Sequence, residues 1–287
     1  GKILSIHTKF TNKEFLMAKN KLNGKDAFEQ YYFSLYGERW TSLKESFATE
    51  PLYATFQYKD LKPYYLDSAS VFASNCLPLK EASEILDMCA APGGKSLIIA
   101  SKMDENTNLV CNERSADRRN RLCTVLKESL PENINNNIQI TGNDGSLICK
   151  KTDKKFDSIL LDAPCSSERH VYNSPKHLEQ WTASRVKNLS FTQWSLLSSA
   201  FLSLKEEGFI LYSTCALAQE ENDGVVKKLL KKYAKSDFEE YKISIEQINF
   251  EDCIKNLPPC VKIPELIIEK TEFGYQILPD KNRGAGP

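Results

Sequence analysis

The sequence has no excess of charge of either sign, since 38 lysines and arginines balance 38 aspartates and glutamates. Overall charge therefore does not attract a polyanion, and any contact with nucleic acid requires a local basic face. Runs of about 18 or more apolar residues are also missing, so no transmembrane helix is predicted. The remaining composition, 41% hydrophobic and 26% charged, is typical of a folded globular protein and argues against disorder.

The nine cysteines include no C-x-x-C pair. A C-x-x-C pair is typical of structural zinc sites, and an odd number of scattered cysteines is not typical of a disulfide framework. We therefore expect no metal site, and reduced thiols in an intracellular compartment. No apolar segment with a small-residue cleavage site follows Gly1, so no secretory signal is expected. A chain that starts at Gly1 can have lost a targeting segment. We therefore expect the protein in the cytoplasm, or in the mitochondrion if a transit peptide was removed.

Residues 1–73 hold 15 of the 29 aromatic residues and show no regular alternation of strands and helices. Patterns at 12–21 and 27–47 predict amphipathic helices, so we interpret this segment as a mainly helical, aromatic-rich extension. Its aromatic residues are expected to form a small core. The alternative is that a few of them stack on nucleic-acid bases beside a cleft.

Residues 74–287 are interpreted as an α/β domain. From Ser83 onward short apolar runs alternate with helical patterns, which predicts a mostly parallel, doubly wound sheet covered on both faces. Strands are predicted at 85–88, 108–111, 138–141, 158–161 and 209–212, and helices near 95–103, 115–129, 190–205 and 220–234. Ligands of such sheets bind beyond the carboxyl ends of the strands, so the residues there are candidates for a site.

A turn rich in small residues follows the first predicted strand and opens a helix. Its backbone amides can approach a ligand closely, and a helix N-terminus favours a carboxylate or phosphate. The candidate cofactor-binding residues of this turn are Cys89, Ala90, Ala91, Pro92, Gly93, Gly94 and Lys95. Lys95 and Ser96, with Asp162 at a later strand end, also resemble the P-loop of an NTPase. However, Cys89 stands where that motif needs its first glycine.

Acidic residues end the next three predicted strands. Glu113 lies about twenty residues past the glycines, where a carboxylate can accept hydrogen bonds from both ribose hydroxyls. Asp144, followed by Gly145, can accept from an adenine amino group, and Asp162 ends the fourth strand. A single acid at such a place is usually a helix cap or a turn residue. Three of them beside the glycine turn favour a site for a nucleoside cofactor.

Cys165 and Cys215 follow the fourth and fifth predicted strands, which are expected to be neighbours. Their thiols should converge on one cleft, where a thiolate can act as a nucleophile. A lone cysteine is usually a small buried hydrophobe, and this is our interpretation for the cysteines outside these two positions and the glycine turn. They are Cys76, Cys111, Cys123, Cys149, Cys253 and Cys260.

Several of these segments resemble one family. Residues 87–96, 162–166 and 212–217, together with Glu221-Asn222-Asp223, are similar to motifs of the Nop2/Sun (Fmu-type) RNA cytosine-5 methyltransferases. The cysteines in D-A-P-C-S and S-T-C-x-L are the most specific of these motifs. The resemblance implies a Rossmann-like class I methyltransferase fold. Residues 28–40 and 64–70 also resemble the branch with the animal mitochondrial small-subunit rRNA methyltransferase and its tRNA-modifying relative.

The resemblance implies S-adenosyl-L-methionine as the cofactor. It places Glu113 on the ribose, Asp144 near the adenine and the turn at 89–95 around the methionine part. Arg118, Gly145 and Asp162 complete the expected cofactor-binding set.

The substrate implied by the resemblance is a cytosine in RNA, with rRNA favoured over tRNA. Cys215 is expected to add to C6, because cytosine C5 is too weak a nucleophile unaided, and Cys165 to help eliminate the adduct. Asp162 is expected to bind the N3 and amino edge of the base, and Lys95 to order the site. The base must leave its stack to reach both thiols.

Two alternatives stay open. In DNA cytosine-5 methyltransferases the attacking cysteine follows a proline in the fourth-strand motif, and Pro164-Cys165 matches that place. A non-catalytic RNA-binding assembly factor is the second alternative, although a scaffold has no need of two thiols in one cleft.

The chain departs from the family pattern in two respects. Asp223 replaces the usual second glutamate of E-N-E, and no ferredoxin-like or PUA-type RNA-binding domain is recognisable. RNA must then dock on the N-terminal extension, on a protein partner or on a basic face. The candidate basic residues are Lys227, Lys228, Lys231 and Lys232, the loop at 150–155, and Arg118, Arg119 and Arg121.

The last residues predict a strand at 275–279 and a turn at 284–287. An unpaired strand edge exposes backbone donors and acceptors and invites aggregation. We therefore expect the native chain to continue with one antiparallel strand of about 5–10 residues.

Overall fold

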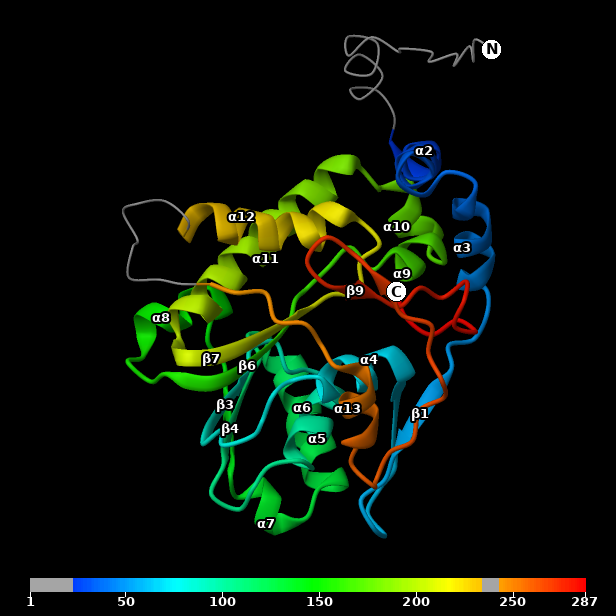
Figure 1. Cartoon of the computed structure of the whole chain (residues 1–287). Helices are drawn as coiled ribbons and strands as arrows, with labels where there is room; N and C mark the ends of the chain where they lie inside the picture. Colours follow the sequence, from blue (N-terminus) through cyan, green and yellow to red (C-terminus); the bar gives the residue numbers. More distant parts are fainter. Residues whose placement is uncertain (1–22, 234–242) are drawn as a thin grey trace, which may run out of the picture.

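A five-stranded parallel sheet lies at the centre of the molecule (Figure 1). The computed structural model describes residues 23–233 and 243–287. The strand order is β5-β4-β3-β6-β7, and every neighbouring pair is parallel. The strands are β3 Glu84–Asp87, β4 Asn108–Asn112, β5 Ile138–Thr141, β6 Phe156–Asp162 and β7 Leu204–Ser213. All five predicted strands and the doubly wound α/β class are confirmed.

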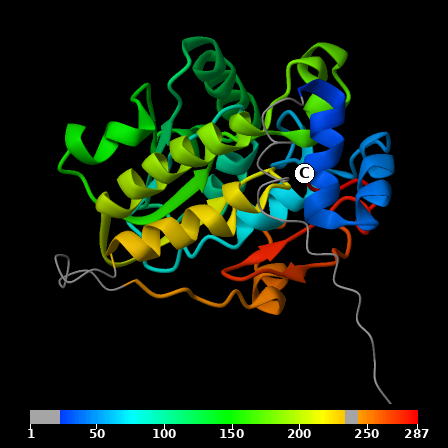
Figure 2. The same ribbon diagram turned by 90° about the horizontal axis from the view of Figure 1, so that it is seen from above.

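Helices cover both faces of this sheet. Neighbouring residues of one strand enter different cores: Ile85 packs with one pair of helices and Leu86 with the other. The first pair is α5 Gly94–Ala100 and α6 Ala116–Ser129, and the second is α11 Ala183–Leu202 and α12 Asp223–Tyr233. Figure 2 shows α11 and α12 side by side on one face. Burial on both faces explains why the strands are nearly continuous apolar runs.

The predicted helices are confirmed, with two changes in their bounds. The helix predicted near 190–205 begins earlier, at Ala183, and ends at Leu202 because β7 starts two residues later. The helix predicted at 27–47 is two helices, α2 Gly24–Tyr36 and α3 Arg39–Phe47, separated at Gly37, whose φ of 56° is a left-handed value that favours glycine. The helix predicted at 12–21 lies outside the described residues.

Shorter elements join these parts. The helices are α4 Ser68–Asn75, α7 Glu132–Asn135, α8 Ile148–Lys151, α9 Glu168–Tyr172, α10 Pro175–Glu179 and α13 Phe250–Lys255, with 3-10 turns η1 Gly145–Leu147 and η2 Gln219–Glu221. An antiparallel pair, β1 Tyr53–Phe56 and β2 Tyr64–Asp67, lies before the main sheet in the chain.

Aromatic residues of α2 and α3 form a core, as predicted. Phe28, Tyr32 and Trp40 are at most 1% exposed. They pack with Trp181, which precedes α11, and with Leu217, which follows β7. Residues on both sides of position 73 therefore share this core, and a division into domains 1–73 and 74–287 stays a prediction.

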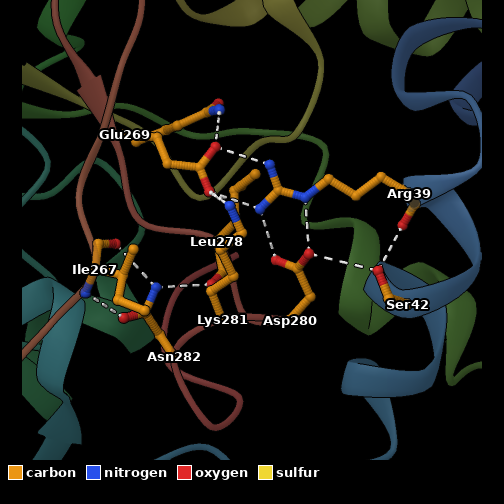
Figure 3. A network of polar contacts seen from close by, with 9 residues as sticks. Arg39, Ser42, Ile267, Glu269, Leu278, Asp280, Lys281 and Asn282 are labelled. Carbon is orange, nitrogen blue, oxygen red and sulfur yellow. Dashed lines mark hydrogen bonds and ion pairs between the residues drawn. The ribbon is translucent and has the colours of Figure 1, made fainter.

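The C-terminal segment differs from the expected unpaired strand. Its strand is short, β9 Tyr275–Gln276, and pairs with β8 Glu269–Lys270 in a separate antiparallel sheet. Arg39 of α3 holds the segment with ion pairs of 2.7 Å to both Glu269 and Asp280 (Figure 3). The expected unpaired edge at 275–279 is therefore wrong, because the partner strand precedes it in the sequence.

Candidate functional site

The glycine turn lies between β3 and α5, at the carboxyl edge of the sheet. Gly93 has a φ of 119°, which L side chains rarely adopt. A Cβ on Gly94 would lie 2.8 Å from Cε1 of Tyr64. The turn lines a cavity of about 120 Å³ together with Tyr64, Leu66 and Asp162. Gly94 therefore lets the backbone approach this cavity closely, whereas Gly93 provides the left-handed turn and lies against Leu122 and Val125 of α6.

Lys95 and Asp162 form an ion pair in the wall of this cavity. Lys95 Nζ lies 2.7 Å from Oδ2 of Asp162, and the Ser213 hydroxyl donates to Oδ1 at 2.9 Å. The pair joins the first turn of α5 to the ends of β6 and β7. The structure thus brings together Lys95 and Asp162, which the prediction placed at this edge of the sheet, and adds Ser213, which the prediction did not include.

Asp87, at the end of β3, is the buried carboxyl of the site. Its Oδ2 accepts a hydrogen bond from the Ser96 hydroxyl at 2.7 Å. Burial, more than the nearby Asp162, raises the pKa of Asp87 to about 7. Burial also raises the pKa of the Cys89 thiol to about 12, so Cys89 is a neutral wall residue.

Glu113 follows β4 and is 4% exposed. Its carboxylate accepts from the backbone N–H of Ser115 at 2.8 Å and pairs with Arg118 at 3.2 Å. Arg118 also donates to the carbonyl of Ala91 in the glycine turn at 2.8 Å. Glu113 and Arg118 therefore lie beside the turn, as the cofactor prediction requires, and Arg118 connects them.

Asp144 and Gly145 follow β5, at the same edge of the sheet. Asp144 accepts from the Ser146 hydroxyl and backbone N–H, and these bonds, with Arg114, lower its pKa. Gly145 is buried, and a Cβ there would lie 2.7 Å from Leu196. Close packing against α11 therefore favours glycine at this position.

Sequence reasoning did not identify Asn112 as a site residue. Its side chain is 1% exposed and donates to the carbonyls of Met88 and Asn143. Its oxygen accepts from Thr141 and from the Asn143 backbone. Asn112 therefore joins the ends of β3, β4 and β5. In the sequence, the only sign of this role was an asparagine directly before Glu113 at the end of a predicted strand.

Cys165 and Cys215 meet, as predicted from their strand ends. Asp162 of β6 pairs in register with Ser213 of β7, so both following loops leave the sheet together. The Cα atoms of the two cysteines are 6.3 Å apart, and the structure joins their sulfur atoms as a disulfide. The two loops therefore bring the thiols together, and the reduced state expected for them stays a prediction.

The residues of Glu221-Asn222-Asp223 each hold a different loop. Asn222 pairs with the Thr214 hydroxyl and donates to the Ala216 carbonyl at 2.8 Å, on either side of Cys215. Asp223 accepts from Thr271 and from backbone N–H groups in the turn between β8 and β9. Glu221 accepts from the backbone of Ser166, next to Cys165. The motif thus binds the loops of both cysteines and, through Asp223, the turn between β8 and β9.

A larger cavity of about 1960 Å³ includes Asp162 and Cys215 in its lining. It extends to Tyr53 and Arg169 on one side and to Tyr275 on the other. Cys215 is therefore reached from a space larger than the small cavity at the glycine turn.

Much of the predicted basic charge is engaged within the protein. Arg119 donates to the backbone carbonyls of Glu113 and Arg114, and Lys154 pairs with Glu84 at 2.6 Å. Lys227 pairs with Glu272 at 3.1 Å. The basic residues of α12 that follow Lys227 form no ion pair with an acidic side chain in the described part of the chain.

Comparison with known proteins finds a family model described as 16S rRNA methyltransferase RsmB/F, which matches residues 74–267. The mitochondrial tRNA (cytosine(34)-C(5))-methyltransferase of Danio rerio is 32% identical over 231 residues, which cover 79% of this chain and 59% of that protein. Ribosomal RNA small subunit methyltransferase F of Klebsiella pneumoniae (strain 342) is 36% identical over 168 residues, covering 58% and 34%. The chain thus spans between 34% and 59% of the length of these two relatives.

Solved structures share the fold. A methyltransferase homolog from Pyrococcus horikoshii has a TM-score of 0.65 at 20% identity and covers 95% of both chains. NSun6 from the same organism, solved with SFG, has a TM-score of 0.52 at 25% identity, covering 67% of this chain and 47% of that one. Both confirm the Rossmann-like methyltransferase fold. Because the family model spans most of the chain, including the glycine turn and both cysteines, the chain belongs to the RsmB/F family of 16S rRNA methyltransferases.

Proposed function

We propose that the protein transfers a methyl group from S-adenosyl-L-methionine to C5 of a cytosine in RNA, through a covalent adduct with Cys215. The observation that carries this proposal is the meeting of Cys165 and Cys215 beside the Lys95–Asp162 pair. Two thiols at the ends of adjacent strands, next to a cofactor turn, suit an addition followed by an elimination.

The residues at the edge of the sheet fit S-adenosyl-L-methionine. The cavity at the glycine turn has walls that a Cβ on Gly94 would disturb, and it suits the methionine part. The buried carboxylate of Glu113 suits the two ribose hydroxyls, and Asp144 suits the adenine amino group. The cofactor supplies the methyl group when bound. Arg118 keeps Glu113 and the turn together.

The two cysteines have separate roles in this proposal. The thiolate of Cys215 forms the bond to C6, and the electrons of the C5–C6 double bond shift toward N3, where Asp162 can stabilise a proton. After methylation a base takes the proton from C5, the electrons of that C–H bond restore the C5–C6 double bond, the sulfur–C6 bond breaks, and Cys215 leaves as a thiolate. Cys165 assists this elimination. Both steps require the reduced form of the pair.

The face formed by α11 and α12 is the docking surface that we propose for RNA. α11 contains no acidic residue. Phe191 is 50% exposed with Lys228 Nζ 4.8 Å from its ring centre, and Lys232 lies over Trp194. Aromatic rings with nearby lysines suit bases and phosphates. α12 also begins directly after Asn222, which contacts the Cys215 loop.

Both rRNA and tRNA are named among the relatives, and we propose rRNA as the first candidate substrate because the family model carries that name. The exposed Tyr65 of the N-terminal extension, or a protein partner, would then help to guide the RNA.

Among residues 23–233 and 243–287, no helix has the length and hydropathy to cross a bilayer. Two relatives are named mitochondrial, and we propose the mitochondrion or the cytoplasm as the compartment.

Bisulfite sequencing of total rRNA and tRNA, from cells with and without the gene, tests this function. We expect one or a few cytosines to lose 5-methylation, in rRNA first and otherwise in tRNA, and the purified protein to restore them. Unchanged RNA together with lost methylation in DNA would favour the DNA-enzyme alternative. No change in either, with normal cofactor binding, would favour the assembly factor.

A further inference from the structure

A buried polar network connects α2 to the loop that carries Cys165. The Tyr32 hydroxyl donates to Oε1 of Glu168 at 2.7 Å, and the Ser166 hydroxyl donates to the same oxygen at 2.6 Å. The backbone N–H of Ser166 donates to Oε2 of Glu221 at 2.9 Å. Two carboxyl groups thus hold the residue that directly follows Cys165.

Gln193 of α11 holds the other side of Cys165. Its Nε2 donates to Oε2 of Glu221 at 2.8 Å and to the carbonyl of Pro164 at 2.9 Å. Pro164 directly precedes Cys165. The backbone is therefore bound on both sides of this cysteine by groups that converge on Glu221.

The network is sealed from water. Its side chains are at most 1% exposed: Tyr32, Ser166, Glu168, Gln193 and Glu221. Neither carboxyl group forms an ion pair with a lysine or arginine in the part of the chain that the structure describes. A buried carboxylate without a cation is costly, and two neighbouring ones are more so.

Protonation follows from this burial. Burial first, and then the neighbouring Glu168, raise the pKa of Glu221 to about 7. Burial likewise raises the pKa of Glu168. Glu221 is therefore partly protonated near neutral pH.

The other polar groups that face the pair come from three elements. From α2, Tyr31 bonds Glu220 of η2 and Tyr36 bonds the Leu217 carbonyl, and from β7 Tyr212 bonds the Glu221 carbonyl. Burial raises the pKa of all three tyrosines, so they stay neutral. Glu221 is thus the group of the network whose charge changes near neutral pH.

We propose that Glu168 and Glu221 are positioning residues that set the place of Cys165, and that Tyr32 makes this place depend on the N-terminal helices. The proposal rests on the proposed function where it assigns adduct release to Cys165. None of the three residues needs to touch the RNA. Their effect should therefore fall on release of the adduct rather than on its formation.

Tyr32→Phe tests the link to α2, with Tyr31→Phe as the matched control. Both remove one hydroxyl from the same group of aromatic residues, but only the Tyr32 hydroxyl donates to a carboxyl of the network, whereas that of Tyr31 donates to Glu220. In single-turnover assays with reduced protein and methylatable RNA, we expect Tyr32→Phe to slow decay of the Cys215–RNA adduct about tenfold. Adduct formation should change less than about twofold, and Tyr31→Phe should match the wild type in both steps. Equal slowing of both steps by Tyr32→Phe, or no slowing, would overturn the proposal.

A second measurement needs neither RNA nor activity. In reduced Cys215→Ser protein, the rate of Cys165 alkylation by iodoacetamide is followed by mass spectrometry from about pH 5 to about pH 9. We expect an inflection near neutral pH, besides that of the thiol, which the added Glu221→Gln substitution removes. Bound S-adenosyl-L-methionine of unchanged affinity shows that the double variant is folded. Identical profiles would refute the proposal, whereas this inflection together with no RNA methylation by the wild-type protein would refute the proposed function alone.

Discussion

Replacing Glu113 by alanine is expected to weaken cofactor binding while the protein stays folded. Glu113 is 4% exposed at the end of β4, and its carboxylate would accept bonds from both ribose hydroxyls. Hydrogen bonds to a charged group contribute about 1.5–3 kcal/mol, so the dissociation constant should rise about 10- to 150-fold. The substitution also removes the ion-pair partner of Arg118. The Arg118 side chain donates to the Ala91 carbonyl of the glycine turn as well, so its loss of position would reach the turn.

Calorimetric titration with S-adenosyl-L-methionine measures this loss. Glu113→Gln keeps an oxygen that can accept from Ser115 and should lose less affinity than Glu113→Ala. Glu132→Ala is the control, since Glu132 is an exposed residue at the start of α7. A change below about twofold in Glu113→Ala, or an equal loss in Glu132→Ala, would refute the placement of the ribose.

Three further predictions concern the same edge of the sheet. Gly94→Ala should weaken cofactor binding about tenfold or more because its Cβ would lie 2.8 Å from Tyr64. Gly274→Ala, whose Cβ would have its nearest neighbour at 3.9 Å, should leave the affinity measured by calorimetry unchanged. Equal affinities of the two variants would contradict this prediction. Asp87 has a pKa raised to about 7 and so holds its proton in the folded state. The stabilising contribution of the protonated Asp87 is complete below the pKa of the unfolded state and is lost as pH rises through about 7. In the wild type the free energy of unfolding should therefore fall by up to about 4 kcal/mol between about pH 4 and pH 8, and Asp87→Asn should remove this fall. Urea denaturation measures it, and parallel curves for the two proteins would contradict the prediction. Oxidation that joins Cys165 to Cys215, whose Cα atoms are 6.3 Å apart, should abolish methylation but not cofactor binding, and dithiothreitol should restore it; full activity of protein shown by mass spectrometry to be oxidised would contradict the thiolate mechanism.

The sheet and most of the site follow from local patterns. Runs such as Ile159-Leu160-Leu161 are buried on both faces, so period and length alone predict the strands. Parallel strands bring their carboxyl ends to one edge, and for this reason strand order along the chain is enough to place Glu113, Asp144 and Asp162 near the glycine turn.

Contacts between distant segments could not be predicted in this way. Tyr32 and Glu168 are 136 residues apart, and neither neighbourhood contains a signal for the other. The β8–β9 pair is only two residues long on each side, too short for an alternating pattern, and Arg39 fixes its position from α3. The disulfide between Cys165 and Cys215 depends on loop geometry that register alone does not determine.

The most direct test of the mechanism compares covalent capture of RNA by two single variants. Reduced Cys165→Ala and Cys215→Ala proteins are incubated with S-adenosyl-L-methionine and total RNA from cells that lack the gene, and the denatured protein is analysed for bound RNA by gel electrophoresis. Cys165→Ala should accumulate a protein–RNA adduct that maps to Cys215, and Cys215→Ala should form none. An adduct in Cys215→Ala and none in Cys165→Ala would contradict the assignment and reverse the roles of the two cysteines.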